Sequence, residues 1–220
     1  VYGSIAALLL VAPIIIGIRG GTSESTTNIG QVYYSSNQFL NHSAVNPVFS
    51  FMSSFERTAG DNCEYKLLDE KVCASIMKGL YNTESTDVDT LLNTRRPNVL
   101  IVIMEGCGGE FTELGNHPEA MPNLNRMANE GVYFTNCYGN SYRTDRGTVS
   151  ILSGYPSFPT ISVMKIPSKS RTLPSIARSL TKEGYGTDFL YGGDIDFTNM
   201  RSYLLSTGYQ HIFSKENYTA

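Results

Sequence analysis

The sequence lacks any excess of positive charge. Its 17 lysine and arginine residues are interspersed with 20 aspartate and glutamate residues along the 220-residue chain, which gives a formal net charge of -3. Nucleic acid binding demands a basic patch that matches the charge of the phosphate backbone, and no such patch is visible here. We therefore do not expect nucleic acid among the partners of this protein.

Cysteine is scarce, and its spacing argues against a structural zinc site. The four cysteines form neither a Cys-x-x-Cys pair nor a cluster with histidine at zinc-finger spacing. Cys63 and Cys73 are close enough to close a short disulfide loop in an oxidising compartment. Free buried thiols are the alternative. The sequence also lacks low-complexity tracts, and a hydrophobic content of 41% is ordinary for a packed core, so general disorder is not expected.

Charged residues are absent from the first 18 positions. The apolar run at residues 5–18 is shorter than the roughly 20 residues that span a bilayer. However, the chain starts with Val1 rather than methionine and is apolar from that point. We therefore predict that residues 1–18 are the end of a longer transmembrane helix. A buried core helix and a signal segment are the alternatives, although no basic n-region or small-residue cleavage site is visible.

Residues 19–96 are rich in serine, threonine, asparagine and tyrosine, and we interpret them as an extracytoplasmic linker. Within this region, Pro47 fits the first turn of one amphipathic helix. The apolar positions of this helix are Val45, Val48, Phe49 and Met52. We expect the helix either to lie along the membrane surface or to pack on the following domain, which begins after Arg96.

From residue 97 onward, apolar runs alternate with amphipathic segments. The run NVLIVIM is continuous and β-branched, which is typical of a strand buried on both faces of a parallel sheet. The alternation predicts an α/β fold with a parallel sheet. The predicted strands are residues 98–104, 132–138 and 187–193, and the predicted helices begin near residues 122, 144, 174 and 197, with three ending at Gly131, Gly184 and Gly208.

Glu105 directly follows the first predicted strand. Gly106, Gly108 and Gly109 come next and let the backbone turn close to a ligand. Because ligands bind at the carboxyl ends of strands in open α/β sheets, this carboxylate is well placed to hold a metal ion. A solvated loop carboxylate is the alternative interpretation.

Thr144 falls near the start of a predicted helix, in the stretch RTDRGTVSILSGYPS. The unpaired N–H groups and the positive end of the dipole at such a position favour an alkoxide or a bound phosphate. Threonine is a weak nucleophile unless a metal or a base activates it. The alternative is that Thr144 or Asp145 merely caps the helix.

Four stretches together resemble one known family. They are PNVLIVIMEG, MPNLNRMANEGVYFTNCY, RTDRGTVSILSGYPS and GYGTDFLYGGDIDFTNMRSYLLSTGY. These are similar, in order, to the extracellular domain of the lipoteichoic acid synthase and phosphoglycerol transferase group, within the sulfatase and alkaline phosphatase superfamily. The resemblance implies an α/β fold with a mostly parallel sheet and helices on both faces. Residues 97–220 would be the N-terminal part of its catalytic domain, and the stretch upstream resembles the group's connection to the membrane.

The resemblance also implies an enzyme, either a transferase or a hydrolase. In that family the acidic residue at the strand end and the threonine at the helix start bind one divalent metal ion (Mn²⁺, Zn²⁺ or Mg²⁺), and the threonine is covalently modified. Glu105 and Thr144 match these positions. The implied reaction moves a phospho-head group, such as glycerol phosphate, from a phospholipid donor to water or to an envelope glycan or alcohol acceptor. The implied location is the cytoplasmic membrane, with the catalytic domain on its periplasmic or extracellular side.

The sequence departs from the family pattern in two places. The family completes its metal site with an Asp-His pair further along the chain, and no histidine here follows an aspartate. We therefore expect the sequence to be truncated, and this fragment alone to bind metal weakly and to be inactive. Where the family has HG-x-D and an FWNR-like stretch, this chain has YGGD and FTNMR. A different head group is therefore expected, with Tyr191, Asp194 and Arg201 as candidate substrate-binding residues.

Two other functions are compatible with parts of this pattern. A sulfate-ester hydrolase of the same superfamily would need a cysteine or serine in a C/S-x-P-x-R motif, and the equivalent stretch here begins Thr144-Asp145-Arg146. A non-catalytic, membrane-tethered binding domain would keep the fold and lack the reaction.

Overall fold

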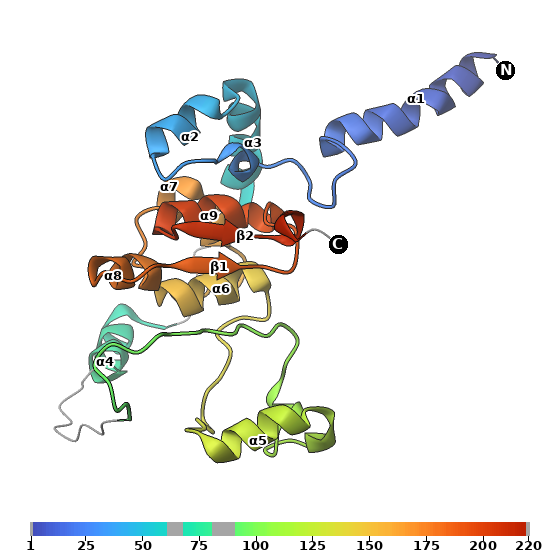
Figure 1. The fold of residues 1–220 in the computed structure, drawn as a ribbon. Helices are drawn as coiled ribbons and strands as arrows, with labels where there is room; N and C mark the ends of the chain where they lie inside the picture. Colours follow the sequence, from blue (N-terminus) through green and yellow to red (C-terminus); the bar gives the residue numbers. More distant parts are fainter. Residues whose placement is uncertain (1, 61–67, 81–90, 219–220) are drawn as a thin grey trace.

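Two short parallel strands lie at the centre of the packed part of the chain (Figure 1). The computed structural model describes residues 2–60, 68–80 and 91–218. Strand β1 (Asp188–Leu190) pairs with β2 (His211–Phe213), and Phe189 lies opposite Ile212. Helix α9 (Met200–Thr207) connects the two strands, so they form a β-α-β unit. The α/β character predicted from the sequence is confirmed, with a small parallel sheet.

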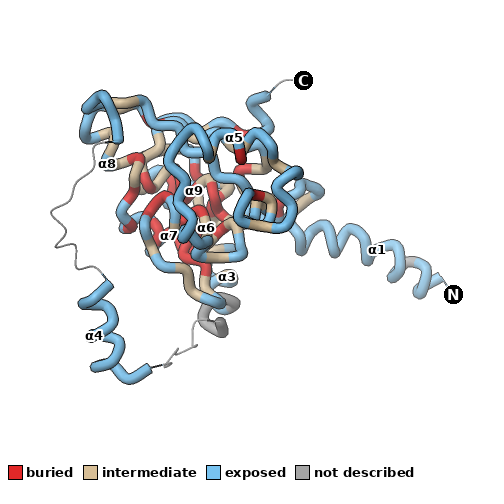
Figure 2. The backbone as a smooth tube through the Cα atoms, turned by 90° about the horizontal axis from the view of Figure 1, so that it is seen from below, coloured by how far each residue is buried: buried red, intermediate tan, exposed pale blue. Residues whose placement is uncertain are grey.

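The remaining helices divide into those packed around this unit and those that project from it. Figure 2 shows the buried residues gathered around α6, α7 and α9, whereas α1 and α4 are exposed along their length. The packed helices are α6 (Thr144–Ser153), α7 (Pro167–Ser170) and α8 (Ile176–Lys182). The others are α1 (Tyr2–Arg19), α2 (Gln38–Ala44), α3 (Pro47–Gly60), α4 (Glu70–Leu80) and α5 (Pro122–Glu130).

Local sequence signals explain where several helices begin and end. Helix α5 has Pro122 as its first residue, and α8 is capped by Ser175, whose side chain accepts a hydrogen bond from the Arg178 N–H. Helix α9 ends at Gly208, which adopts a left-handed conformation with φ 97°. Pro47 opens α3 as the sequence predicts.

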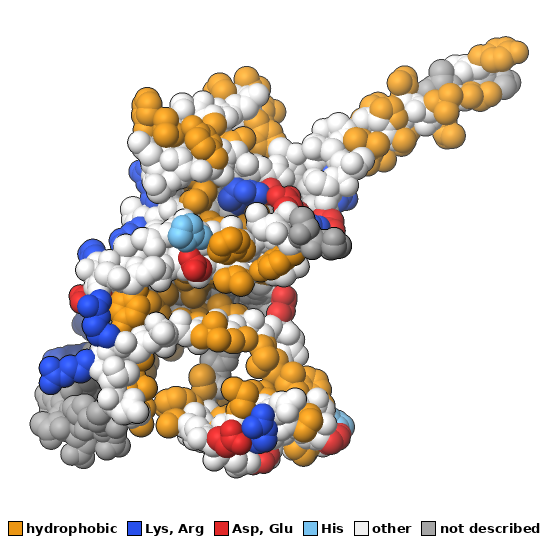
Figure 3. Space-filling view, in the orientation of Figure 1, with side chains coloured by type: hydrophobic (Ala, Val, Ile, Leu, Met, Phe, Trp, Pro, Cys, Tyr) orange, Lys and Arg blue, Asp and Glu red, His pale blue; other side chains and the backbone are white. Residues whose placement is uncertain are grey.

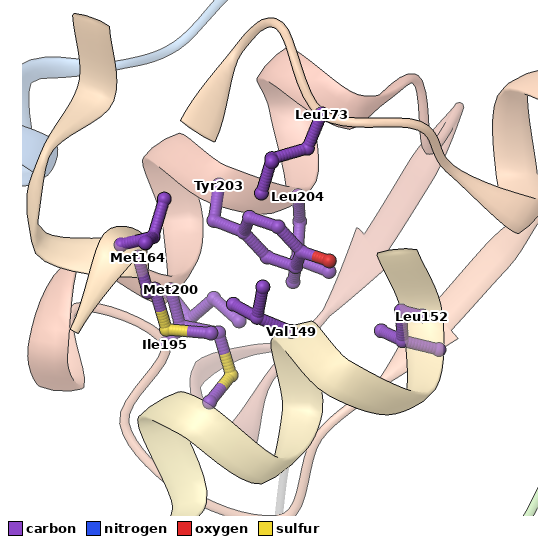
Figure 4. Close-up of a cluster of buried hydrophobic side chains, with 9 residues drawn as sticks. Val149, Leu152, Met164, Leu173, Ile195, Met200, Tyr203 and Leu204 are labelled. Atoms are coloured by element: carbon purple, nitrogen blue, oxygen red, sulfur yellow. The ribbon is translucent and has the colours of Figure 1, made fainter. Parts of the chain in front are cut away.

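A cluster of buried side chains joins α6 to α9 (Figure 4). Val149 and Leu152 of α6 pack in the same cluster as Met200 and Leu204 of α9. Tyr203 is 0% exposed, and its hydroxyl is hydrogen-bonded to Ser153 Oγ at 2.7 Å. Burial of the Tyr203 phenol raises its pKa to about 12. The cluster therefore contains one polar pair that is satisfied internally.

The structure contradicts the strand predicted at residues 98–104. In Figure 1 this segment passes below α6, and it does not pair with any described strand. Val99, Ile101 and Ile103 are 54%, 45% and 41% exposed, so the segment is not buried on both faces. An apolar run marks a segment suited to burial, but a strand also requires a partner edge at hydrogen-bonding distance. Among the described residues, 98–104 have no such partner.

The strand predicted at residues 132–138 is also wrong. The segment is irregular, and the side chains of Val132, Phe134 and Tyr138 are exposed. Because the segment lacks a described partner strand, it forms no inter-strand hydrogen bonds with the described residues despite its apolar pattern. Cys63 of the predicted disulfide loop lies outside the described residues, and Cys73 is an exposed free cysteine.

Part of the region interpreted as a linker packs against the domain. We call residues 24–33 the docking segment. Ser25 Oγ donates to Asp194 Oδ2 at 2.5 Å, and the Gly30 N–H donates to Asn199 Oδ1 at 3.1 Å. Tyr33, at the end of the segment, is buried. The path from α1 to the domain is therefore held by specific contacts.

Helix α1 has the length and composition to cross a membrane. Its 18 residues have a mean hydropathy of 1.9, and none of that window is buried against the rest of the chain. By length and composition α1 is a candidate membrane span, a composition that apolar core helices and signal segments share.

We expect Tyr203→Phe to lower the free energy of unfolding by about 1–3 kcal/mol, because Ser153 Oγ would remain buried without its partner. Denaturant unfolding of the whole chain measures this change. The double variant Tyr203→Phe with Ser153→Ala is the control, and it is expected to be less destabilised than the sum of the two single changes. Strict additivity would mean that the hydroxyl pair contributes nothing.

Candidate active site

Thr144 is the first residue of α6. Arg143 precedes the helix with extended backbone and provides no side-chain capping bond, so neither Thr144 nor Asp145 is the N-cap. The first helical N–H groups have no partner within the helix, and the helix dipole adds positive potential at this end. An anion near Thr144 would therefore be stabilised by the backbone itself.

Glu105 and Thr144 meet in the folded chain. The Thr144 hydroxyl donates a hydrogen bond to Glu105 Oε1 at 2.5 Å, although the residues are 39 positions apart. Gly106, with φ 68°, turns the chain directly after Glu105. The convergence expected from the sequence is therefore found, even though the segment that carries Glu105 is not paired as a strand.

Asp145 directly follows Thr144 in the sequence and is ion-paired with two cationic side chains. Asp145 is the second residue of α6, and its side chain is 4% exposed. Arg143 Nε lies 3.7 Å from one carboxylate oxygen, and Lys165 Nζ lies 3.6 Å from the other. Both cationic side chains remain about half exposed. The sequence pattern indicates Asp145 only as a possible helix cap and gives no signal for Lys165, because no local signal links residues 20 positions apart.

Tyr191 shares a cavity with Glu105 and Thr144. The cavity has a volume of about 450 Å³ and is bounded by residues 99–103, β1 and α8. Burial raises the pKa of the Tyr191 phenol, and the negative charges of Glu105 and Asp194 raise it further. Tyr191 therefore stays protonated at neutral pH and presents a neutral hydroxyl.

Asp194 and Arg201 are engaged elsewhere and are not among the described residues that line this cavity. Burial acts to raise the pKa of Asp194, but hydrogen bonds from Ser25 and the Asp196 N–H, together with the Lys215 charge, bring it below its ordinary value. Arg201 Nε binds Asp196 Oδ1 at 2.6 Å, and this hydrogen bond raises the Arg201 pKa. Of the three predicted substrate-binding residues, the structure brings one to the Glu105–Thr144 pair.

The described residues provide part of a metal site. A carboxylate and a hydroxyl oxygen are suitable ligands for a hard divalent cation, and Glu105 and Thr144 present them at one point. No group of three or more His, Cys, Asp or Glu side chains with metal-binding geometry occurs in residues 2–60, 68–80 and 91–218. A complete site needs additional ligands.

Comparison with known proteins places these residues in a wider group. The Sulfatase family model matches residues 97–220, a range that includes Glu105, Thr144 and Tyr191. A solved structure described as a protein in the alkaline phosphatase superfamily from Vibrio parahaemolyticus is 34% identical in sequence, with a TM-score of 0.43. The match covers 45% of this chain and 24% of that chain, so this chain spans about a quarter of the length of the solved protein.

We expect the docking segment to loosen in acid before the sheet does. The Asp194 pKa is lowered in the folded chain, so its contribution to docking is present above the ordinary carboxyl pKa and is lost as the pH falls through the lowered value. Hydrogen-exchange protection factors of residues 24–33, compared with those of β1 and β2, measure this effect.

The matched variant for this experiment is Asp194→Asn, which keeps the side-chain shape but does not titrate. It should weaken docking at neutral pH by about 1 kcal/mol, because Ser25 then donates to a neutral acceptor at a partly exposed site. Its residual protection should depend less on pH over the acidic range, and the remaining dependence is expected from the Glu24–Lys215 ion pair. Equal acid sensitivity in the variant would assign the effect to another group.

Proposed function

Because the chain belongs to the Sulfatase family, we propose that it forms part of a metal-dependent enzyme that transfers or hydrolyses a phospho-head group through a covalent intermediate on Thr144. The sulfatase and alkaline phosphatase superfamily comprises hydrolases and transferases that typically depend on divalent metals. The observation that carries the proposal is the 2.5 Å contact between Thr144 Oγ1 and Glu105 Oε1 at the start of α6. It combines a nucleophile, a carboxylate and a positive helix terminus at one point.

The reaction has two displacement steps. Thr144 Oγ attacks phosphorus, the bond from phosphorus to the leaving alcohol oxygen breaks, and the threonine proton passes to Glu105 Oε1. The leaving oxygen then takes up this proton from Glu105, directly or through water, and becomes the free alcohol, so Glu105 is again a carboxylate. In the second step, an oxygen of water or of an acceptor alcohol attacks phosphorus and releases Thr144, while the attacking group's proton restores the threonine hydroxyl.

The chain contributes charge stabilisation at the same place. The helix dipole and the first N–H groups of α6 favour developing negative charge, and the half-exposed Arg143 and Lys165 add positive potential. Glu105 and Thr144 are the residues that would hold the divalent ion. When bound, such an ion lowers the pKa of the hydroxyl and screens the phosphate charge. Tyr191 supplies a neutral O–H for a substrate oxygen.

Sulfate-ester hydrolysis is the second candidate, and the family match is the observation that favours it. Sulfate and phosphate esters carry similar charge and shape, so the helix terminus and the cationic pair would accept either. Thr144 argues for phosphate, because a formylglycine nucleophile is made from cysteine or serine and not from threonine.

The proposed location is the cytoplasmic membrane, with the catalytic domain on the extracytoplasmic side. The proposed partners are a phospholipid donor and an envelope glycan or alcohol acceptor. The apolar composition of α1 supports this proposal, since a lipid donor must be reached at a membrane surface.

The full-length protein should sediment with membranes and stay there in high salt, because anchorage by α1 depends on apolar burial rather than on charge. Carbonate and molar salt washes, followed by detergent, measure the release. Replacing Leu9 and Ile15 with lysine places two charges in α1, which should weaken the anchorage and increase the fraction of the protein released from the membranes. Complete release of the unmodified protein by salt alone would contradict the proposed anchor.

In the full-length enzyme, Thr144→Ala should abolish the covalent adduct and reduce turnover by about a thousandfold or more, because the nucleophile is missing. Intact-mass analysis after incubation with phospholipids detects the adduct and identifies the transferred group. Thr172→Ala is the matched control, since Thr172 is exposed and its hydroxyl binds only the Lys169 carbonyl among the described contacts. Glu105→Gln should raise the metal concentration needed for activity.

Three outcomes discriminate among the proposals. A phospholipid-derived adduct on Thr144 supports head-group transfer, whereas turnover of aryl sulfate and not of phospholipid supports the second candidate. Undiminished activity of Thr144→Ala would refute the covalent mechanism for both substrates.

A further inference from the structure

The stretch of chain between Glu24 and Glu56 carries no strong charge. Residues 25–55 contain no aspartate, glutamate, lysine or arginine, although these make up 17% of the chain. Protein surfaces in water are normally charged, so a long uncharged stretch that remains exposed is unusual. This stretch includes α2 and the described side chains of α3.

Large apolar side chains are exposed along this stretch. On α3, four of them recur at positions that share one side of a helix. We call them the α3 apolar face, namely Val48, Phe51, Met52 and Phe55, and their exposed fractions lie between 60% and 69%. Phe51 and Phe55 pack edge to face with ring centroids 5.0 Å apart. A contiguous exposed face of this kind marks an interaction surface.

The position of this face suggests its partner. In Figure 1, α2 and α3 lie at the same end of the molecule as the point from which α1 projects, and α5 lies at the opposite end. Figure 3 shows hydrophobic side chains over α2 and α3 and along α1. The helix suited to spanning a bilayer therefore emerges beside a second, uncharged apolar surface.

Helix α2 is hydrogen-bonded to the residues that directly follow the docking segment. Asn41 of α2 is 0% exposed, its Oδ1 accepts hydrogen bonds from the N–H groups of Tyr34 and Ser35, and its Nδ2 donates to the Ser35 carbonyl. The docking segment is bound in turn to Asp194 and Asn199. Two residues separate helix α3 from α2, so the α3 apolar face is linked along the chain to the docking segment.

We propose that the α3 apolar face lies in the interfacial layer of the lipid bilayer, next to α1, and that the docking segment thereby sets the orientation of the catalytic domain at the membrane. The proposal rests on the membrane location suggested for α1 and not on the chemistry of Thr144. Because the face lacks basic residues, its insertion is driven by apolar burial and does not depend on anionic lipid.

The absence of tryptophan from the chain provides a direct test. Single-tryptophan variants of the full-length protein are reconstituted in phosphatidylcholine vesicles, with and without phosphatidylglycerol, and quenched by brominated lipids. Met52→Trp reports on the α3 apolar face. Met127→Trp on α5 is the matched control, because the two methionines are 62% and 61% exposed and both lie on helices. Leu9→Trp reports on α1.

We expect the Met52→Trp emission to shift to the blue and to be quenched by brominated lipid at least threefold more strongly than that of Met127→Trp, equally in both lipid mixtures. Phe51→Trp, an aromatic replacement, should behave like Met52→Trp and guards against misfolding of one variant. Quenching of Leu9→Trp without quenching at positions 51 and 52 would overturn this inference while preserving the membrane anchor.

Two other results would also count against the proposal. If brominated lipid quenches none of Leu9→Trp, Phe51→Trp and Met52→Trp, both the proposed membrane anchor and the proposed bilayer contact of the α3 apolar face are wrong. If Met52→Trp is blue-shifted but insensitive to brominated lipid, the face is covered by protein, such as a second copy of this chain, and not by the bilayer.

Discussion

The packing of α6 against α9 is the contact on which the other features depend. Val149 and Leu152 place one side of α6 in the core beside Met200 and Leu204. Since Thr144 begins α6, burial of that side also fixes where the helix terminus points. Helix α9 extends the same arrangement to the docking segment, because Asn199, immediately before it, accepts the Gly30 N–H. One core therefore positions both the candidate nucleophile and the connection towards α1.

The electrostatics of the site follow from a single buried carboxylate. Asp145 is stabilised by the N-terminus of its own helix and by Arg143 and Lys165, which it holds at 3.7 and 3.6 Å. Because both cations remain half exposed, their charge is available to a substrate as well as to Asp145. Asp145 thus holds two cationic side chains near the start of α6, and their combined charge exceeds its own by one, which suits an anionic ester.

The polar residues after β1 divide between two tasks. Tyr191 lies in the cavity with Glu105 and Thr144, whereas Asp194 binds Ser25 and Arg201 binds Asp196. The stretch that resembles a head-group binding motif is thus used in part to hold the docking segment. In the proposed function, Tyr191, Arg143 and Lys165 then recognise the head group. The contact that holds the docking segment, at Asp194, lies three residues after Tyr191 of the candidate site.

Local features of this protein were determined by the sequence itself. The start of α5 at Pro122, the end of α9 at Gly208 and the helix that begins at Thr144 depend on backbone preferences within one or two turns, so pattern and composition predict them. The meeting of Glu105 with Thr144 was accessible only through family resemblance. Tertiary structure alone decided the unpaired state of residues 98–104, the Asp145–Lys165 contact and the use of Asp194 by Ser25. Each of these requires a partner that is distant in sequence, and hydrophobic periodicity describes a segment's suitability for burial without specifying which edge or charge will meet it.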